Sequence, residues 1–323
     1  MTLRLPGLAA GLLSIAMVSA CGATGGRGAD DGRLSVVAAF YPLEYAVQQV
    51  GGTHVDVQGL TKPGAEPHDL ELTPRQVAKV AQADVVVYEE HFQPAVDAAV
   101  AQQAGRTSLD VSTAARLDLA LVEDGHDHGD EHAGETEEQT ETDDQHADHG
   151  ARDPHFWLDP MRYADVGDAI AARLAERDPG NAAAYRANAA AFRASMRTLD
   201  GEFRTGLASC ATKELVTSHA AFGYLSQTYG FHQESITGLS PDAEPSPAAM
   251  AELTAHIRET GATTVYAETL VSQDVARTLA RETGARLAVL DPIEGITSAS
   301  AGRDYPSVMR ANLQVLRAGQ ECS

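Results

Sequence analysis

Three observations predict an α/β protein of two lobes. Apolar β-branched runs alternate with helix-like segments in both halves of the chain, which is typical of parallel sheets with helices on both faces. With 323 residues, the chain is longer than one typical core requires. Between the two alternating regions, the sequence shows only helical periodicity. We expect two (βα)4 lobes joined by a long rigid linker helix.

The first lobe is expected to occupy residues 33–160. Its strands are short β-branched runs, and they are predicted at residues 34–40, 54–60 and 84–88. Its clearest helix begins with Thr73 at the N-cap and Pro74 in the first turn. The helices are predicted at residues 41–52, 73–83 and 94–104.

The helical linker is expected at residues 161–209. Two helices, at residues 163–177 and 181–207, are separated by the breaker Asp178-Pro179-Gly180. The second would span about 40 Å and could brace both lobes. Two ordinary surface helices, which would leave the lobes free to hinge, are the alternative.

The second lobe is expected at residues 210–323, where the alternation resumes. Its strands are predicted at residues 214–218, 263–267 and 286–290. Its helices are predicted at residues 221–229, 247–260, 272–283 and 306–316. Several of these helices end at a glycine, as helices commonly do. We expect about four βα units in each lobe, including units that the pattern shows only weakly.

The N-terminus has the features of an export signal. Residues 1–20 combine Arg4, an apolar stretch and small residues, and Pro6 and Gly7 interrupt any spanning helix. The tetrad Val-Ser-Ala-Cys ending at Cys21 resembles a bacterial lipoprotein box, which implies lipidation of Cys21. We expect residues 21–32 to form a lipidated tether and the protein to lie outside the cytoplasm, anchored to the outer face of the membrane. A cleaved signal with a coincidental cysteine is the alternative.

Two further cysteines, Cys210 and Cys322, invite a disulfide in an exported protein. Such a bond would attach the C-terminal helix to the start of the second lobe. Two free buried thiols are the alternative. A metal site is not expected from two cysteines without short spacing.

A segment rich in histidine and carboxylates occupies residues 121–150. It carries 12 acidic residues and no lysine or arginine. The net charge of the whole chain is −22, so −10 remains for the rest. Nucleic-acid partners are therefore not expected. We expect this segment to be a disordered loop that attracts metal ions through its five imidazoles. These are His126, His128, His132, His146 and His149.

Four polar residues outside that loop are candidate metal ligands. They are His68 after Pro67, His155 in DPHFWLDP, His219 at the end of one predicted strand, and Asp291 at the end of another. Ligands of open parallel sheets bind at the carboxyl ends of strands, so two facing sheets would bring these side chains into one cleft between the lobes.

Three other carboxylates lie near these candidates. Glu294 in LDPIEG is an alternative fourth ligand, although the strand-end position favours Asp291. Glu66 is separated from His68 by Pro67 and is not expected to bind the metal. Glu268, at another strand end, is expected to support a ligand or to pack at a hinge.

Five motifs resemble a known family. PGAEPHDLELTPRQ, DPHFWLDP, TSHAAFGYLSQTYG, EPSPAAMAEL and LDPIEG are similar to the cluster A-I metal-binding lipoproteins of zinc and manganese ABC importers, over residues 34–322. The resemblance implies a bilobed fold with one long rigid helix and a single metal ion between the lobes. It also implies His68, His155 and His219 as ligands, with Asp291 as the carboxylate. Some zinc members use water in that place, and zinc members carry a similar His-rich loop.

The donor set favours Zn²⁺, because Mn²⁺ prefers more oxygen ligands. The resemblance implies an extracytoplasmic protein that captures zinc and delivers it to an ABC permease and its ATPase. We expect a monomer that is not an enzyme. A manganese-binding homologue, a zinc-dependent hydrolase and an adhesin or zinc buffer are the alternatives; the sequence has no HExxH helix to support hydrolysis.

Overall fold

The computed structural model describes residues 1–2, 32–120 and 152–323, and residues 33–323 form one compact unit. The signal and tether, with Cys21, lie almost entirely outside the described residues, as do the five histidines of residues 121–150. No helix in the described part of the chain combines the length and apolarity needed to cross a membrane.

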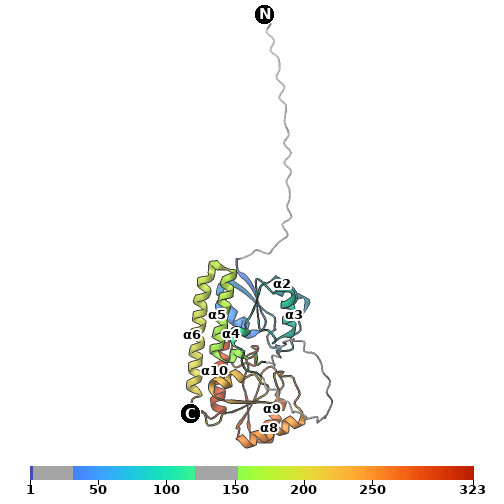
Figure 1. Ribbon diagram of the computed structural model, residues 1–323, viewed down its shortest axis with the longest axis vertical. Coiled ribbons are helices and arrows are strands. Elements are labelled where there is room, and N and C mark those ends of the chain that lie inside the picture. The colour runs from blue at the N-terminus through green and yellow to red at the C-terminus, as the bar shows by residue number, and fades with distance from the viewer. Residues whose placement is uncertain (3–31, 121–151) are drawn as a thin grey trace, which may run out of the picture. The chain divides into compact units, whose positions relative to one another are not determined.

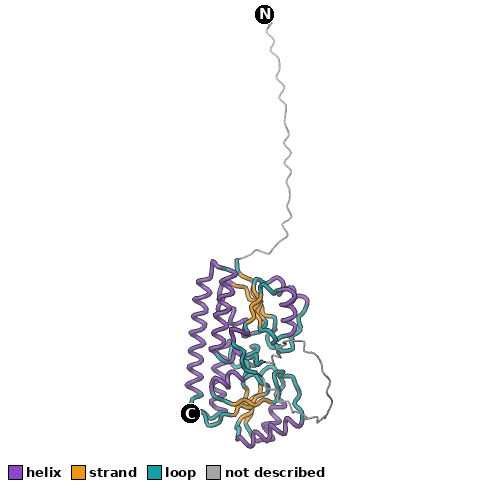
Figure 2. The backbone as a smooth tube through the Cα atoms, viewed as in Figure 1, coloured by secondary structure: helices purple, strands orange, loops and turns teal. Residues whose placement is uncertain are grey.

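The two predicted lobes are confirmed, and each contains a four-stranded parallel sheet (Figure 2). In the first lobe the strand order is β2-β1-β3-β4, and in the second it is β6-β5-β7-β8. The strands of the first lobe are β1 Leu34–Ala38, β2 Val55–Gly59, β3 Val85–Tyr88 and β4 Ser108–Asp110. Those of the second are β5 Glu214–Thr217, β6 His232–Ser235, β7 Thr264–Ala267 and β8 Arg286–Val289.

The helices cover the faces of these sheets and connect their strands. In the first lobe they are α1 Tyr41–Gly51, α2 Pro74–Gln82, α3 Pro94–Gln103 and α4 Ser112–Ala115. In the second lobe they are α7 Gly223–Tyr229, α8 Pro247–Thr260, α9 Asp274–Thr283 and α10 Tyr305–Gly319. Thr73 forms the predicted cap of α2, as part of a capping box with Gln76.

Two strands had no recognisable sequence pattern. β4 has only three residues, all half-buried, and β6 is the polar sequence HQES with alternating exposure. Both lie at sheet edges, where a strand pairs on one side only and needs little apolar surface. β2 and β8 are edge strands too, so the short length of β4 and the polar sequence of β6 explain why the apolar pattern revealed three strands in each lobe rather than four.

The linker is a pair of helices, α5 Pro160–Arg177 and α6 Ala182–Gly206, joined by a short 3-10 turn at Pro179–Asn181. α6 has 25 residues and is therefore about 37 Å long. It runs beside both lobes (Figure 1). Asn188 Nδ2 donates to the α1 carbonyl of Val50 at 3.0 Å, and Glu202 pairs with Arg310 of α10 at 2.7 Å.

The packing makes this linker part of the core. One hydrophobic cluster includes buried residues from both sheets and from α5 and α6. The two linker helices approach closely at Gly167, where a Cβ atom would lie 2.5 Å from a ring carbon of Phe192. The lobes are thus held together by a shared core that includes both linker helices.

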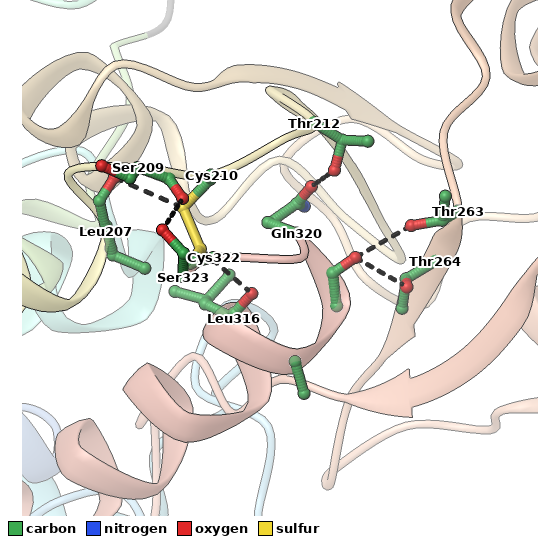
Figure 3. Close-up of a disulfide and its surroundings, with 12 residues drawn as sticks. Leu207, Ser209, Cys210, Thr212, Thr263, Thr264, Leu316, Gln320, Cys322 and Ser323 are labelled. Carbon is green, nitrogen blue, oxygen red and sulfur yellow. Dashed lines mark hydrogen bonds between the residues drawn. A yellow bond between two sulfur atoms is a disulfide. The ribbon is translucent and has the colours of Figure 1, made fainter.

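The structure joins Cys210 and Cys322 in a disulfide, 112 residues apart in sequence (Figure 3). Around it, the Ser323 amide donates to the Ser209 carbonyl at 3.0 Å, and Thr212 hydrogen-bonds to Gln320. The end of α10 is therefore attached to the segment between α6 and β5.

Candidate metal centre

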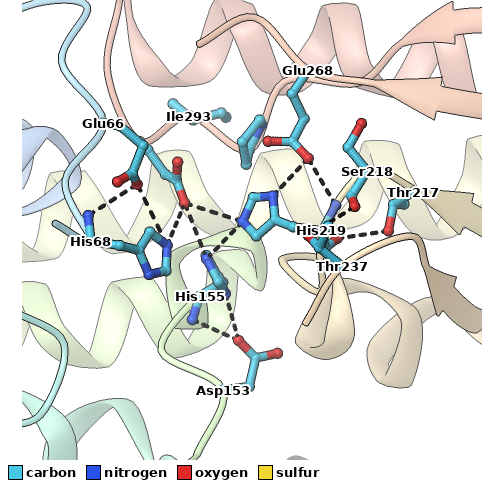
Figure 4. A network of polar contacts seen from close by, with 12 residues as sticks. Glu66, His68, Asp153, His155, Thr217, Ser218, His219, Thr237, Glu268 and Ile293 are labelled. Carbon is cyan, nitrogen blue, oxygen red and sulfur yellow. Dashed lines mark hydrogen bonds and ion pairs between the residues drawn. The ribbon is translucent and has the colours of Figure 1, made fainter. Parts of the chain in front are cut away.

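Three imidazoles converge on one carboxylate oxygen in the cleft between the lobes (Figure 4). The Nε2 atoms of His68, His155 and His219 lie 3.0, 3.1 and 3.4 Å from Oε1 of Glu294. The Nε2 atoms of His155 and His219 are 3.3 Å apart. The structure thus brings together the three predicted histidines and the alternative carboxylate.

Each lobe contributes two of these side chains. His68 lies in the loop between β2 and α2, and His155 precedes the 3-10 turn Phe156–Leu158 that leads into α5. His219 follows β5, and Glu294 lies in the loop between β8 and α10. Because the strands of each sheet are parallel, their carboxyl ends face the same cleft, as the sequence predicted.

Two further carboxylates orient the imidazoles from behind. Asp153 Oδ1 accepts from both the backbone amide and Nδ1 of His155, each at 2.8 Å. Glu268 Oε1 accepts from the His219 amide at 3.0 Å and from its Nδ1 at 2.6 Å. Since an ionised carboxylate only accepts hydrogen bonds, both rings donate from Nδ1 and direct Nε2 into the cleft. Glu268 was expected in such a role; the role of Asp153 was missed, although it belongs to the same motif as His155.

Aromatic side chains pack around the group and bury most of it. The rings of Phe92 and His68 have centroids 4.6 Å apart, and those of Trp157 and His155 are 5.2 Å apart. Trp157 Nε1 donates to the Pro292 carbonyl at 2.8 Å, which links the two lobes directly behind the site. His155 and His219 are fully buried as a result.

The charges in this dry site are strongly coupled. Burial alone would raise the pKa of Glu294, but its hydrogen bonds to the three histidines hold that pKa well below its usual range. Burial opposes protonation of His219, yet the charge and hydrogen bond of Glu268 outweigh it and raise the pKa to about 10. Burial likewise opposes protonation of His155, and its bonds to Asp153 and Glu294 raise its pKa. The metal-free site therefore holds protons where a cation could bind.

Asp291, the carboxylate that the sequence favoured, is not part of the group. Its Oδ1 accepts from the Ile293 amide at 2.8 Å, and its own amide donates to Asn312 of α10 at 3.0 Å. Ile293 then adopts φ of +61°, a left-handed conformation that is unusual for a β-branched residue. This turn carries the chain onward so that Glu294, three residues beyond Asp291, enters the cleft. Asp291 shapes the loop and Glu294 faces the imidazoles.

Glu66 lies at the edge of the centre. It accepts from the His68 amide at 2.9 Å, and its Oε1 is 3.9 Å from His68 Nε2. With Asp69 and Asp242 it forms a second carboxylate group, more exposed than the first. Its contacts are those of a residue that positions the His68 loop.

The sequence is similar to those of several known proteins. The family model described as "Zinc-uptake complex component A periplasmic" matches residues 36–319. The zinc-binding protein AdcA of Streptococcus pyogenes is 37% identical over 291 residues, which cover 89% of this chain and 56% of that protein. The chain thus spans about half the length of the AdcA proteins it matches. The high-affinity zinc uptake system protein ZnuA of Bacillus subtilis is 34% identical over 93% of both chains.

A similar fold is found in a solved structure. Zn(II)-bound AdcA from Streptococcus pneumoniae superposes with a TM-score of 0.72 and 33% sequence identity. The match covers 90% of this chain and 58% of that one. The bilobed architecture described above is therefore shared with a protein whose structure contains zinc.

Proposed function

Because the chain belongs to the zinc-uptake complex component A family, we propose that it captures Zn²⁺ outside the cytoplasm and delivers it to an ABC permease driven by its ATPase. The observation that carries this proposal is the convergence of three Nε2 atoms on Glu294 Oε1, with neighbouring distances of 3.0–3.4 Å. A tetrahedral Zn²⁺ with bonds of about 2.0–2.1 Å spaces its donor atoms roughly 3.3–3.4 Å apart. Four of the six donor pairs therefore lie at or slightly below this spacing, and all four donor atoms lie within 4.8 Å of one another.

In this proposal His68, His155, His219 and Glu294 are the ligands of the transported ion. Zinc replaces the protons that the metal-free group holds, and Glu294 exchanges its hydrogen bonds for a bond to the metal. Asp153 and Glu268 keep the Nδ1 protons of two imidazoles and so fix the direction of their lone pairs. Three nitrogen donors and one carboxylate favour Zn²⁺ over Mn²⁺, which prefers oxygen.

The same burial favours a carrier over a hydrolase. A catalytic zinc keeps an open position for water and room for a substrate. Here the side chains of three of the four ligands are at most 1% exposed and that of His68 is 10% exposed. A closed shell of this kind retains an ion until the protein is opened.

The proposed function also includes a membrane anchor at Cys21 and additional zinc binding by residues 121–150. Lipidation of Cys21 would hold the domain beside its permease, and the histidines of residues 121–150 would bind additional zinc weakly. Deleting residues 123–150 should lower the total zinc stoichiometry and preserve one tight site. An unchanged stoichiometry would refute the role of the loop.

The decisive test is calorimetric titration of residues 22–323 with Zn²⁺ and with Mn²⁺, using His219→Ala and a matched control, His256→Ala. His256 lies on α8, outside the cleft, and contacts Glu214. We expect one tight zinc site that manganese does not occupy, abolished or severely weakened in His219→Ala and retained in the control. Tight zinc binding by His219→Ala would disprove the ligand set, and preferential manganese binding would disprove the choice of metal.

A further inference from the structure

The four proposed ligands differ in their access to solvent. The side chains of His155, His219 and Glu294 are 0–1% exposed, whereas that of His68 is 10% exposed. An ion that reaches this centre without opening the core must therefore approach along His68.

A cavity of about 650 Å³ lies beside His68. The first lobe lines most of it, with residues that follow β3 and β4, and Leu239 closes it from the second lobe. Its walls carry more carboxylates than guanidinium groups: Glu89, Glu90, Asp110 and Asp118 against Arg116 and Arg152, together with the imidazole of His91. This composition suits a hydrated cation, because carboxylates and imidazole bind both the ion and its water.

Glu89 is the least satisfied group in that wall. It directly follows the central strand β3, is only 2% exposed, and its Oε2 has no hydrogen-bond partner among the described residues. Burial, together with the charges of Asp153, Asp110 and Asp97, raises its pKa well above the usual range. A buried carboxyl oxygen without a partner is costly to the fold, so it points to a ligand that supplies the missing contact.

The backbone around the cavity supports the same conclusion. His91 and Arg116 both line it; His91 has φ of +73° within a turn, whereas Arg116, at +54°, is the left-handed C-cap of α4. Side chains other than glycine rarely adopt this conformation, and it clusters at functional sites. Asp97 holds the first of these turns by accepting from the His91 amide at 3.0 Å.

We propose that this cavity is the entrance to the zinc centre and that Glu89 binds the hydrated cation there before it passes His68. The inference rests on the proposed zinc capture and adds a route and a transient site to it. A hydrated ion would exchange its water for the imidazoles one at a time, starting with His68. In this proposal Glu89 binds the ion only transiently, during entry, and is not a ligand of the final complex.

Such a site has a kinetic signature. A group on the only route in and out changes the rates of entry and exit by the same factor and leaves the dissociation constant unchanged. A ligand, or a residue that supports one, changes the dissociation constant. Trp157, the only tryptophan in the chain, packs on His155 and reports arrival of the ion through its fluorescence.

The test is stopped-flow measurement of Zn²⁺ association, with release measured by adding a chelator. The arriving cation would displace the proton that burial keeps on Glu89, and an amide has no such proton to give up. We therefore expect Glu89→Gln to slow both rates by about tenfold, the lower end of the rate effects produced by charged clefts. Glu259→Gln, the same change at an exposed position of α8, should alter neither rate. Leu239→Trp should slow both rates by filling the cavity, and it keeps the proposal testable if Glu89→Gln does not fold.

Two results would overturn the entrance. One is unchanged rates in Glu89→Gln and Leu239→Trp; slower entry in Asp69→Asn or Asp242→Asn would then place the route at the second carboxylate group. The other is a larger dissociation constant with an unchanged association rate, which would mean that Glu89 supports the final complex. In both cases wild-type protein still binds zinc tightly, so failure of the entrance is distinct from failure of zinc capture.

Discussion

The two lobes place a glutamate at the same topological position and use it differently. β3 and β7 are equivalent strands in sheets of the same order, and Glu89 and Glu268 directly follow them. Both are 2% exposed. Glu268 accepts two hydrogen bonds from His219, whereas Glu89 has an unpartnered oxygen among the described residues and faces a cavity.

The difference arises from the residues that follow the neighbouring strand of each sheet. β5 is followed by Ser218 and His219, so an imidazole lies within reach of Glu268. The equivalent strand β1 is followed by Ala39 and Phe40, so Glu89 meets no imidazole from that strand. The fold thus fixes where each carboxyl group stands, and its neighbours decide whether it is hydrogen-bonded to an imidazole or left facing a cavity.

The largest effect on zinc affinity should come from the carboxylate on which both lobes converge. Glu294→Gln keeps the shape but removes the charge facing three imidazoles. We expect a loss of more than about 100-fold, because losing a ligand should exceed the 10–100-fold typical of its outer partners. Chelator competition measures this, with Glu259→Gln as the control. Wild-type affinity in Glu294→Gln would exclude this residue as a ligand.

The next effect compares the equivalent glutamates directly. Glu268→Gln should weaken zinc binding by about 10–100-fold, because Nδ1 of His219 loses its anionic acceptor. Glu89→Gln should leave the dissociation constant unchanged. If the two variants bind zinc equally tightly, the hypothesis that Glu89 and Glu268 have different roles is wrong.

The protonation of the two buried histidines predicts a further effect, that of pH on zinc affinity. With the pKa of His219 near 10 and that of His155 raised, zinc must displace protons at neutral pH. Affinity should therefore rise with pH above 7, by about tenfold per unit for each proton released. Titrations at pH 6, 7, 8 and 9 measure this, and Glu268→Gln should flatten the upper part of the curve. A wild-type curve that is flat from pH 7 to 9 would contradict these pKa directions.

The same proton stabilises the metal-free fold. The pKa of His219 is higher in the folded chain than the unfolded value of about 6.5. Its contribution is thus fully present below pH 6.5 and is lost as the pH rises through about 10. Urea unfolding of metal-free protein should show a falling free energy of unfolding across this interval, after correction with His219→Ala.

The smallest effect on zinc affinity is expected from the disulfide, which only the second lobe contains among the described residues. Reduction, or Cys210→Ser with Cys322→Ser, should lower the free energy of unfolding by about 2–5 kcal/mol. Zinc affinity should change less than about threefold, because the bond lies at the end of α10 remote from the cleft. A large loss of affinity would show that the second lobe depends on this bond to hold its ligands.

Much of the fold could be predicted from the sequence because the central strands are continuous apolar runs and the helices have clear caps. The three histidines could be predicted as candidate ligands because each occupies a strand end or a rigid proline motif. The sequence favoured Asp291 over Glu294 because Asp291 has the expected strand-end position, whereas in the structure its carboxylate turns back to the Ile293 amide. Nothing in the sequence signals that an isoleucine adopts a left-handed conformation. Glu89 had a visible signal, its place after the run DVVVY, but an unpartnered oxygen can be recognised only in three dimensions.

The long helix α6 has a thermodynamic consequence. Since α6 and the shared core join the two lobes, we expect the four donor atoms to be preorganised, so that little free energy of binding is consumed in bringing them together. Zinc affinity is thereby coupled to the integrity of a helix pair that never touches the ion. A methyl group added at Gly167 would crowd Phe192 at the contact between α5 and α6. We therefore expect such a substitution to weaken zinc binding.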